Sequence, residues 1–306
     1  MSNQSNIHCV AVFGGSGFLG RAIIKSLVAD GIPVRVAVRS PDNANIPEPS
    51  SQAGEIEAIY ADVRDETSVA LAMEGCDAVI NAVGLYVERG AETFEAVHEI
   101  GALNVAHQCA ARDVGCLIHI SGIGADVNSE SSYVRARGKG ELLAKDVFAK
   151  ITILRPSVLF GPDDKFLNTL AKLTRVSPVL PLFGEGHTKL QTVYVGDVAQ
   201  AACRALQDHG IRGQSYELGG PRAYTYRELI ELILDRLNKR RLLLPLPFFV
   251  WETMAALLSV LPVPPLTRDQ VALMKRDNVV AKNARSLQDL DVKATALETI
   301  LPEYSF

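Results

Sequence analysis

Hydrophobic and polar residues follow one another in regular blocks along the first half of the chain. Short apolar runs predict buried strands at residues 9–13, 33–38, 56–61, 77–81, 116–121 and 151–156. The segments between them predict helices at residues 21–30, 67–73, 92–112 and 131–150, and a loop at 40–54. Strands that alternate with helices predict an α/β fold, a doubly wound parallel sheet of the Rossmann type.

The second half of the chain follows a different pattern. It predicts helices at 165–175, 197–207 and 226–238, strands at 190–195 and 216–219, and a loop at 177–184. We therefore expect residues 1–160 to form a dinucleotide-binding domain to which residues 188–210 return. Residues 161–187 and 211–306 are expected to form a smaller, mostly helical C-terminal region that also supplies a docking region.

The turn after the first predicted strand is rich in glycine. Gly14 allows the chain to turn sharply, Gly17 lets a pyrophosphate approach the backbone, and Gly20 lets the next helix pack closely on the strand. The helix N-terminus adds free N–H donors and the positive end of its dipole. An ordinary glycine-rich turn is the alternative. The predicted cofactor contacts in this turn are Gly14, Ser16, Gly17, Phe18, Leu19 and Gly20.

Three further strand ends predict contacts with the cofactor. Arg39 follows the second strand, where an acidic residue would bind the ribose of NAD, so NADP(H) is expected in preference to NAD(H). A solvated surface arginine is the alternative. Asp62 and Val63 follow the third strand and could contact adenine, although Asp62 could equally cap a turn. After the fourth strand the small residues Ala82, Val83 and Gly84 leave room for the second half of a dinucleotide.

Three polar residues form a candidate catalytic group. Ser121 ends the fifth strand, and Tyr133 and Arg137 lie one turn apart on one face of the following helix. A cation beside a tyrosine stabilises the phenolate and is expected to lower the tyrosine pKa from about 10. With a serine to hold the substrate oxygen, this arrangement suits hydride transfer at a carbonyl. An unrelated surface tyrosine and arginine are the alternative.

Composition narrows the class of protein. The net charge of −4 gives no reason to expect nucleic acid as a partner. The five cysteines are scattered and form no metal-ligand pattern, so they predict reduced core residues of a cytoplasmic protein without a metal site. The segment Met1–Asn6 is short and polar, and it predicts no signal peptide.

A long apolar run interrupted by prolines follows the basic triplet Lys239–Arg241. The run, residues 242–266, carries one charge, Glu252, and its uninterrupted part, residues 248–261, is too short to span a bilayer. A helix packed on the rest of the C-terminal region is one interpretation. The other is a docking surface over residues 239–266 for a membrane or a partner protein.

Several motifs together resemble one family. They are GGSGFLG at residues 14–20, Asp62-Val63, ISGIGAD at 120–126, RPSVLFGP at 155–162 and VYVGDVA at 193–199. They resemble the extended and atypical short-chain dehydrogenase/reductases. Residues 121–141, 264–270 and 276–280 are most similar to the nucleotide-binding accessory subunit of respiratory complex I and its bacterial relatives.

The resemblance implies a Rossmann fold, bound NADP(H), a cofactor contact at Pro156, a Ser–Tyr–Lys active site, and a small lid domain formed by residues 161–187 and 211–306 that shapes the substrate pocket. Ser121 and Tyr133 match that family's serine and tyrosine, whereas Arg137 replaces its lysine. Arginine keeps the charge but is larger, planar and never deprotonated, so cofactor binding could survive while turnover falls. The resemblance thus implies a complex I accessory or assembly subunit at the inner face of an energy-transducing membrane. The alternatives are an NADP-dependent oxidoreductase for an apolar or quinone-related carbonyl or alcohol, and, less favoured, a nucleotide-sugar epimerase or dehydratase.

Overall fold

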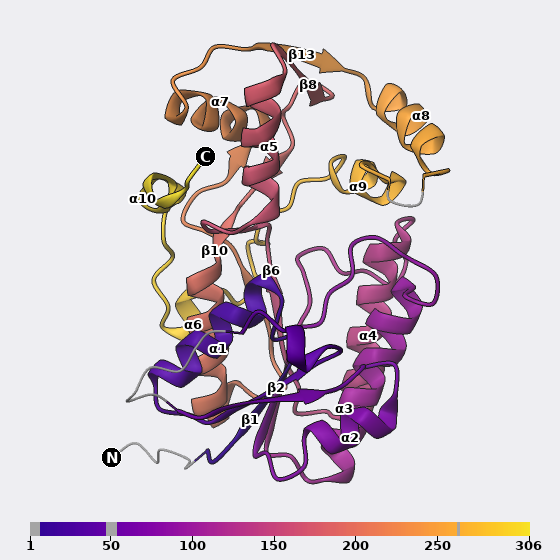
Figure 1. The fold of residues 1–306 in the computed structure, drawn as a ribbon, viewed down its shortest axis with the longest axis vertical. Coiled ribbons are helices and arrows are strands. Elements are labelled where there is room, and N and C mark those ends of the chain that lie inside the picture. Colours follow the sequence, from indigo (N-terminus) through magenta and orange to yellow (C-terminus); the bar gives the residue numbers. More distant parts are fainter. Residues whose placement is uncertain (1–6, 47–53, 262–263) are drawn as a thin grey trace. The chain divides into compact units, whose positions relative to one another are not determined.

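The computed structural model describes residues 7–46, 54–261 and 264–306 and divides into two compact units (Figure 1). The first unit comprises Met1–Pro156, Val195–Glu217 and Ala284–Lys293, and the second comprises Ser157–Tyr194, Leu218–Asn283 and Ala294–Phe306. The polar segment Met1–Asn6, part of the loop expected at 40–54, and two positions of the apolar run at 242–266 lie outside the described residues.

A parallel sheet forms the centre of the first unit. Within the described residues it has seven strands in the order β3-β2-β1-β4-β5-β6-β11. Their bounds are β1 Val10–Phe13, β2 Val34–Val38, β3 Ile56–Tyr60, β4 Ala78–Asn81, β5 Cys116–Ile120, β6 Thr152–Pro156 and β11 Ser215–Leu218. Strand β1 pairs in parallel with both β2 and β4, so the strand order reverses between β1 and β4. The predicted doubly wound fold is confirmed.

Helices cover both faces of this sheet (Figure 1). On one face α1 (Phe18–Ala29) packs against α6 (Val195–Gln207). On the other face α3 (Gly101–Ala111) packs between α2 (Glu66–Ala72) and α4 (Ser132–Val147). A single-turn π-helix, η2 (Glu95–Ile100), leads directly into α3. Such π-helical turns frequently occur at functional sites.

Burial explains why the central strands read as continuous apolar runs. All four residues of β1, all four of β4 and all five of β5 are buried, because helices cover them from both sides. The core between the sheet and the helices α2 and α3 is filled by apolar side chains such as Phe13, Val79, Val105 and Leu117.

The second unit corrects two predictions. Residues 177–184, expected as a loop, contain β8 (Val179–Phe183), which pairs in parallel with β13 (Leu242–Leu246). Residues 190–195 do not join the large sheet. Instead β9 (Lys189–Leu190) pairs with β12 (Tyr224–Thr225), and β10 (Val193–Tyr194) pairs with β7 (Leu159–Phe160). The helices of this unit are α5 (Lys165–Val176), α7 (Tyr226–Arg236), α8 (Phe248–Leu258), α9 (Arg268–Leu273) and α10 (Leu297–Ile300).

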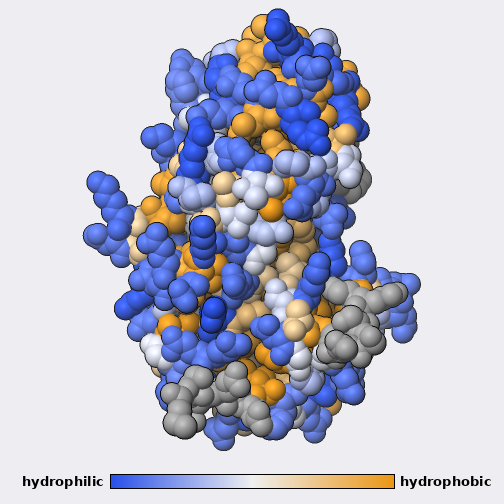
Figure 2. All heavy atoms as spheres, turned by 90° about the vertical axis from the view of Figure 1, so that its left-hand side faces the viewer, coloured by the Kyte–Doolittle hydropathy of each residue, from blue (hydrophilic) through white to orange (hydrophobic). Residues whose placement is uncertain are grey.

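The surface is mixed in character. On the face drawn in Figure 2, hydrophilic residues cover most of the area and apolar residues show as smaller areas between them. Among the described residues, every helix falls short of the combination of length and apolarity that crossing a bilayer requires.

Candidate functional site

The candidate site begins where β1 ends between its two neighbours. Gly14 N donates to Ala37 O of β2 at 3.2 Å, and Ala82 N, just after β4, donates to Phe13 O at 2.9 Å. This is the point at which the strand order reverses. Doubly wound sheets bind ligands in the crevice at such a switch point, outside the carboxyl ends of the strands.

The glycine turn at this point is too crowded for side chains at two positions. Gly14 has φ +78°, and a Cβ there would lie 2.8 Å from the carbonyl of Ala82. A Cβ at Gly20 would lie 2.2 Å from Gly14 O, which shows how closely α1 packs on the turn. Gly17 is exposed and is the N-cap residue of α1, so it offers no side chain to cap the first turn. The backbone donors of that turn therefore face a space free of a capping side chain.

The other predicted residues of the turn differ in exposure. Ser16 is exposed, and its carbonyl accepts a hydrogen bond from Arg21 Nη1 at 3.0 Å. Phe18 is half-buried, whereas Leu19 is buried in the core of the unit. Leu19 can therefore meet a ligand at the turn through its backbone only.

Arg39 lies at the carboxyl end of β2, as predicted, but it is not free. Its guanidinium donates to the carboxylate of Glu92, in the segment before η2. Its side chain is 56% exposed, so the pair lies open to solvent. Glu92 was missed by sequence reasoning, because nothing in the pattern joins two loops that are 53 positions apart.

The sequence left two roles open for Asp62, a contact with adenine or a turn cap. In the structure its contacts are those of a turn-forming residue. Its carboxylate accepts from the backbone N of Arg64 at 3.0 Å and from that residue's guanidinium at 2.5 Å. These bonds from Arg64 hold the pKa of Asp62 below its usual range. Val63 is buried, and its carbonyl accepts from Asn104 of α3 at 2.9 Å.

Two buried polar residues that the sequence analysis missed, Asn81 and His119, support the segment after β4. Asn81 Oδ1 accepts from Val83 N at 3.2 Å, and its amide nitrogen lies 3.4 Å from His119 Nδ1. Ala82 and Val83 are half-buried and Gly84 is exposed. Polar residues at the ends of otherwise apolar strands were the available signal for Asn81 and His119.

Ser121 follows β5 and is almost completely buried. Its backbone N donates to Leu154 O at 2.7 Å, but its Oγ has no hydrogen-bond partner among the described residues. Buried hydroxyls are almost always paired, so an orphaned one needs an explanation such as a ligand. The neighbouring Gly122 lies against the Arg137 guanidinium, where a Cβ would be 3.5 Å from Cζ. Pro156, at the end of β6, is buried, and its carbonyl accepts from Ile123 N at 3.1 Å.

Tyr133 and Arg137 on α4 are in direct contact, as their spacing predicts. Arg137 Nη1 donates to the hydroxyl of Tyr133. The Tyr133 ring packs among Tyr86, Phe94 and His98 at centroid distances of 5.5–5.6 Å. Lys139, the other basic residue nearby, is exposed and pairs with Glu99 at 3.4 Å, away from the tyrosine.

The expected lowering of the Tyr133 pKa is wrong for the protein without a ligand. Burial raises the pKa of Tyr133, and this effect outweighs the attraction of Arg137, which acts in the expected direction. His98 and His119 are also buried, and this burial, with the positive charge of Arg137 as a second cause, lowers the pKa of each to about 3. Both imidazoles are therefore neutral near pH 7, and Arg137 is the only cation among these four residues.

Comparison with known proteins supplies the family. Residues 10–219, from β1 to β11, match the NAD dependent epimerase/dehydratase family. The chain belongs to this family. A complex I protein of Arabidopsis thaliana, the mitochondrial NADH dehydrogenase [ubiquinone] 1 alpha subcomplex subunit 9, is 34% identical over 92% of this chain and 73% of its own length. The mitochondrial 40 kDa subunit of NADH-ubiquinone oxidoreductase of Neurospora crassa is 29% identical over 97% of this chain and 78% of its own.

Comparison with a solved structure supports the fold. MoeE5, in complex with UDP-glucose and NAD, matches with a TM-score of 0.71 at 17% identity, over 96% of both chains. The resemblance to complex I accessory subunits is thus confirmed at the level of sequence similarity, and the Rossmann fold at the level of structure. In this member of the family, the switch point, the glycine turn and the Tyr133–Arg137 pair all lie within the matched residues.

Proposed function

We propose that this epimerase/dehydratase-family chain is an accessory or assembly subunit of a complex I-type respiratory enzyme, in which NADP(H) has a structural role. Its similarity to complex I subunits over nearly the whole chain supports the first part. The geometry of the β1 turn and of Ser121 supports the second. When bound, the nicotinamide would supply hydride chemistry.

The residues of the first unit fit a dinucleotide. The pyrophosphate would lie on the Gly14–Gly20 turn, because Gly17 leaves the backbone open and the α1 dipole favours negative charge. Arg39 would bind the 2′-phosphate in place of Glu92, which is the basis for proposing NADP(H) over NAD(H). Ala82, Val83 and Gly84 leave space beside the turn, and the orphaned Ser121 Oγ would gain a partner.

One observation supports weak or absent turnover: Arg137 donates to the Tyr133 hydroxyl, yet the pKa of Tyr133 is raised by burial. A raised pKa makes the phenol a weaker acid toward a developing alkoxide, and it leaves less phenolate to act as the base for an alcohol. The guanidinium cannot take up or release the proton itself. Binding and catalysis are therefore separable in this site.

The test measures bound nucleotide and turnover on the same protein. We expect purified protein to carry a dinucleotide, identified by mass spectrometry, whose reduced band is not bleached by quinones or aldehydes. Gly17→Ala is the variant for binding: its Cβ would lie 3.1 Å from Gly14 O, a tight contact that a shift of a few tenths of an ångström relieves, and the added methyl group would keep the pyrophosphate away. The unfolding midpoint of the variant is measured alongside, so that loss of binding is separated from loss of folding. Absence of any dinucleotide from the unaltered protein, with no heat on adding one, would contradict the proposal.

A second function, an NADP-dependent oxidoreductase for an apolar carbonyl or alcohol, is favoured by two features: the unpaired hydroxyl of Ser121 and the aromatic group of Tyr86, Phe94 and Tyr133. Bleaching of the reduced band by a quinone or aldehyde would support it. Arg137→Lys separates the two functions. Turnover that increases in this variant shows that Arg137 suppresses catalysis, and unchanged turnover shows that it does not.

We also propose a docking surface in the second unit, formed by the exposed apolar residues of β13, α8 and the segment after α8. Seven of the sixteen large apolar side chains that are exposed in the described residues lie in this stretch, so their density exceeds that of the remaining surface. We call them the β13–α8 surface; they are Leu242, Leu244, Phe249, Met254, Leu257, Val260 and Leu261.

Charge indicates which partner this surface meets. The acidic residue of α8, Glu252, forms an ion pair with Lys275, so its charge is compensated. The basic residues Lys239 to Arg241 lie directly before β13. Exposed apolar side chains beside uncompensated positive charge suit the headgroup region of an anionic membrane. We therefore propose that the protein lies on the face of the energy-transducing membrane.

Vesicle binding tests this surface. We expect the protein to co-sediment with vesicles that contain cardiolipin or phosphatidylglycerol, and Leu257→Glu to weaken binding at least tenfold. Leu71→Glu is the matched control, because Leu71 is also apolar and 57% exposed but lies on α2 of the first unit, outside the surface. Equal binding by both variants would exclude the β13–α8 surface. If the protein is recovered in a large complex but does not bind vesicles, the β13–α8 surface binds a protein partner and not a lipid membrane.

A further inference from the structure

Two cysteine thiols meet at the amino ends of β1 and β4, which is the opposite end of these strands from the glycine turn. Cys9 comes directly before β1, and Cys76 lies two residues before β4, its parallel neighbour. Their Sγ atoms are 2.9 Å apart and share a hydrogen bond. The other cysteines, Cys109, Cys116 and Cys203, are buried, and none of them has a thiol partner among the described residues.

Asp77 fixes the backbone that carries this pair. Its carboxylate accepts from His8 N at 2.6 Å and from Cys9 N at 3.0 Å. Its own N donates to Cys9 O at 3.0 Å, and Cys76 N donates to Met73 O at 3.1 Å. These hydrogen bonds hold both backbone segments in place where the thiols meet. A bond between the two sulfur atoms therefore requires only a small side-chain movement.

The two thiols have different electrostatic surroundings. Arg35 of β2 lies beside them, with Nη1 3.8 Å from Cys76 Sγ and its Nε paired to Glu57 at 2.8 Å. The hydrogen bond from Cys76, with a smaller contribution from Arg35, lowers the pKa of Cys9 to about 7 although burial and Asp77 oppose this. The same hydrogen bond and burial raise the pKa of Cys76. Cys9 is thus the better nucleophile of the two.

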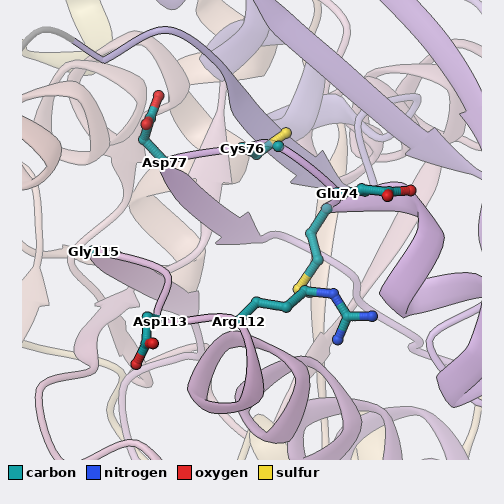
Figure 3. Close-up of a pocket in the computed structure, with 8 residues that line it drawn as sticks. Glu74, Cys76, Asp77, Arg112, Asp113 and Gly115 are labelled. Carbon is teal, nitrogen blue, oxygen red and sulfur yellow. The ribbon is translucent and has the colours of Figure 1, made fainter.

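Open space lies next to the pair. A solvent-open pocket of about 690 Å³ is lined by Cys76 and its neighbours from Met73 to Asp77, together with Arg112, Asp113 and Gly115 (Figure 3). Figure 3 shows Cys76 and Asp77 on the segment that enters the strand, and Arg112 and Asp113 on the facing segment. Cys9 itself is only half-buried. A small uncharged oxidant such as hydrogen peroxide can reach this region.

We propose that Cys9 and Cys76 form a reversible disulfide when the protein meets hydrogen peroxide. The Cys9 thiolate attacks one peroxide oxygen, the O–O bond breaks, and Cys9 becomes a sulfenic acid while hydroxide leaves. The Cys76 sulfur then attacks Cys9 Sγ, the S–O bond breaks, and water leaves with the Cys76 proton. The two thiols lose two electrons, the peroxide gains them, and two waters form once the hydroxide takes up the proton that Cys9 had released.

Peptide mapping of the full-length protein tests the proposal. After treatment with hydrogen peroxide near the protein concentration, we expect a linked peptide pair containing Cys9 and Cys76, lighter by two hydrogens and restored by dithiothreitol. The melting temperature should rise by several degrees, because the link closes a long loop of the unfolded chain. Thiols that stay reduced, or that reach the sulfinic state without the link, would overturn the proposal.

Two variants locate the reactive thiol. Cys76→Ser should leave a sulfenic acid on Cys9 that dimedone labels, because the resolving thiol is missing. Cys109→Ser is the matched control, since it removes a buried cysteine from the same unit and should form the Cys9–Cys76 link at the unaltered rate. Equal dimedone labelling of Cys9 with and without Cys76 would show that Cys76 does not resolve it. If Cys76→Ser fails to fold, the mapping of the unaltered protein still decides the proposal.

Discussion

At the scale of single residues, Arg39 shows how a predicted contact is modified by a partner from a distant segment. The sequence places this arginine after a buried strand, and the structure agrees. The structure adds that its guanidinium is paired with Glu92. A dinucleotide phosphate must therefore compete with a carboxylate for the same cation.

Substitution of Arg39 by aspartate tests the proposed cofactor preference. A charge-assisted hydrogen bond contributes about 1.5–3 kcal/mol, so Arg39→Asp should weaken NADP(H) binding by about 10- to 100-fold. NAD(H) lacks the 2′-phosphate and should lose much less. Calorimetric titration with both nucleotides measures the difference. Arg112→Asp is the control, because Arg112 is also an exposed arginine but lies at the end of α3, beside the pocket lined by Cys76. Equal losses for the two nucleotides would show that Arg39 does not bind the 2′-phosphate.

The candidate catalytic group of Ser121, Tyr133 and Arg137 illustrates what residue spacing can and cannot predict. Helical spacing correctly predicts that Tyr133 and Arg137 touch, because residues one turn apart share a face. It does not predict the direction of the tyrosine pKa, since that depends on how many groups bury the ring. The aromatic neighbours Tyr86 and Phe94 and the imidazole of His98 come from segments whose positions the sequence does not reveal.

At the scale of elements, the central strands buried on both faces were predictable and the proline-containing strands of the second unit were not. Strands β1 and β4 are apolar runs because helices cover both faces of the sheet. Strands β8 and β13 each contain a proline, Pro181 and Pro245, and therefore resemble loops. In a two-stranded sheet each strand has a free edge, so a missing N–H donor need not interrupt the pairing. Their partners also lie about sixty positions apart, where local patterns carry no information.

The glycine turn allows an element-scale prediction with a close control. Gly14 and Gly31 have similar positive φ values, +78° and +75°, so alanine strains the backbone about equally, by roughly 1–2 kcal/mol. Only Gly14→Ala also meets backbone atoms, those of Ala82, at 2.8 Å, whereas Gly31→Ala meets none within 4 Å. Urea unfolding should show a larger loss for Gly14→Ala, and calorimetry should show loss of dinucleotide binding in that variant alone. Similar behaviour of the two variants would contradict the close approach of the turn to the β4 segment.

At the scale of the whole molecule, buried neutral histidines should make folding sensitive to acid. His98 and His119 stay unprotonated in the folded protein down to about pH 3, whereas in the unfolded chain they take up protons below about pH 6.5. The unfolded state then binds more protons, so the free energy of unfolding falls as the pH drops from about 6.5 to about 3. The limiting slope is about 1.4 kcal/mol per pH unit for each histidine.

Urea unfolding at pH 7 and pH 5 measures this dependence. His119→Asn keeps a polar group for Asn81 and should reduce the difference between the two pH values. His187→Asn is the control, because the His187 side chain is 74% exposed. An unchanged pH dependence in His119→Asn would show that His119 is protonated equally in both states.

The chain passes back and forth between the two units, and this has a consequence for its synthesis. The first unit needs α6 and β11, which are translated only after Ser157–Tyr194 of the second unit. A nascent chain that ends at Pro156 leaves the outer edge of β6 unpaired and the apolar side of α1 uncovered. The sheet can therefore be completed only late in translation, and during that interval the unfinished protein exposes an unpaired strand edge and apolar surface, the features that make folding intermediates prone to aggregate.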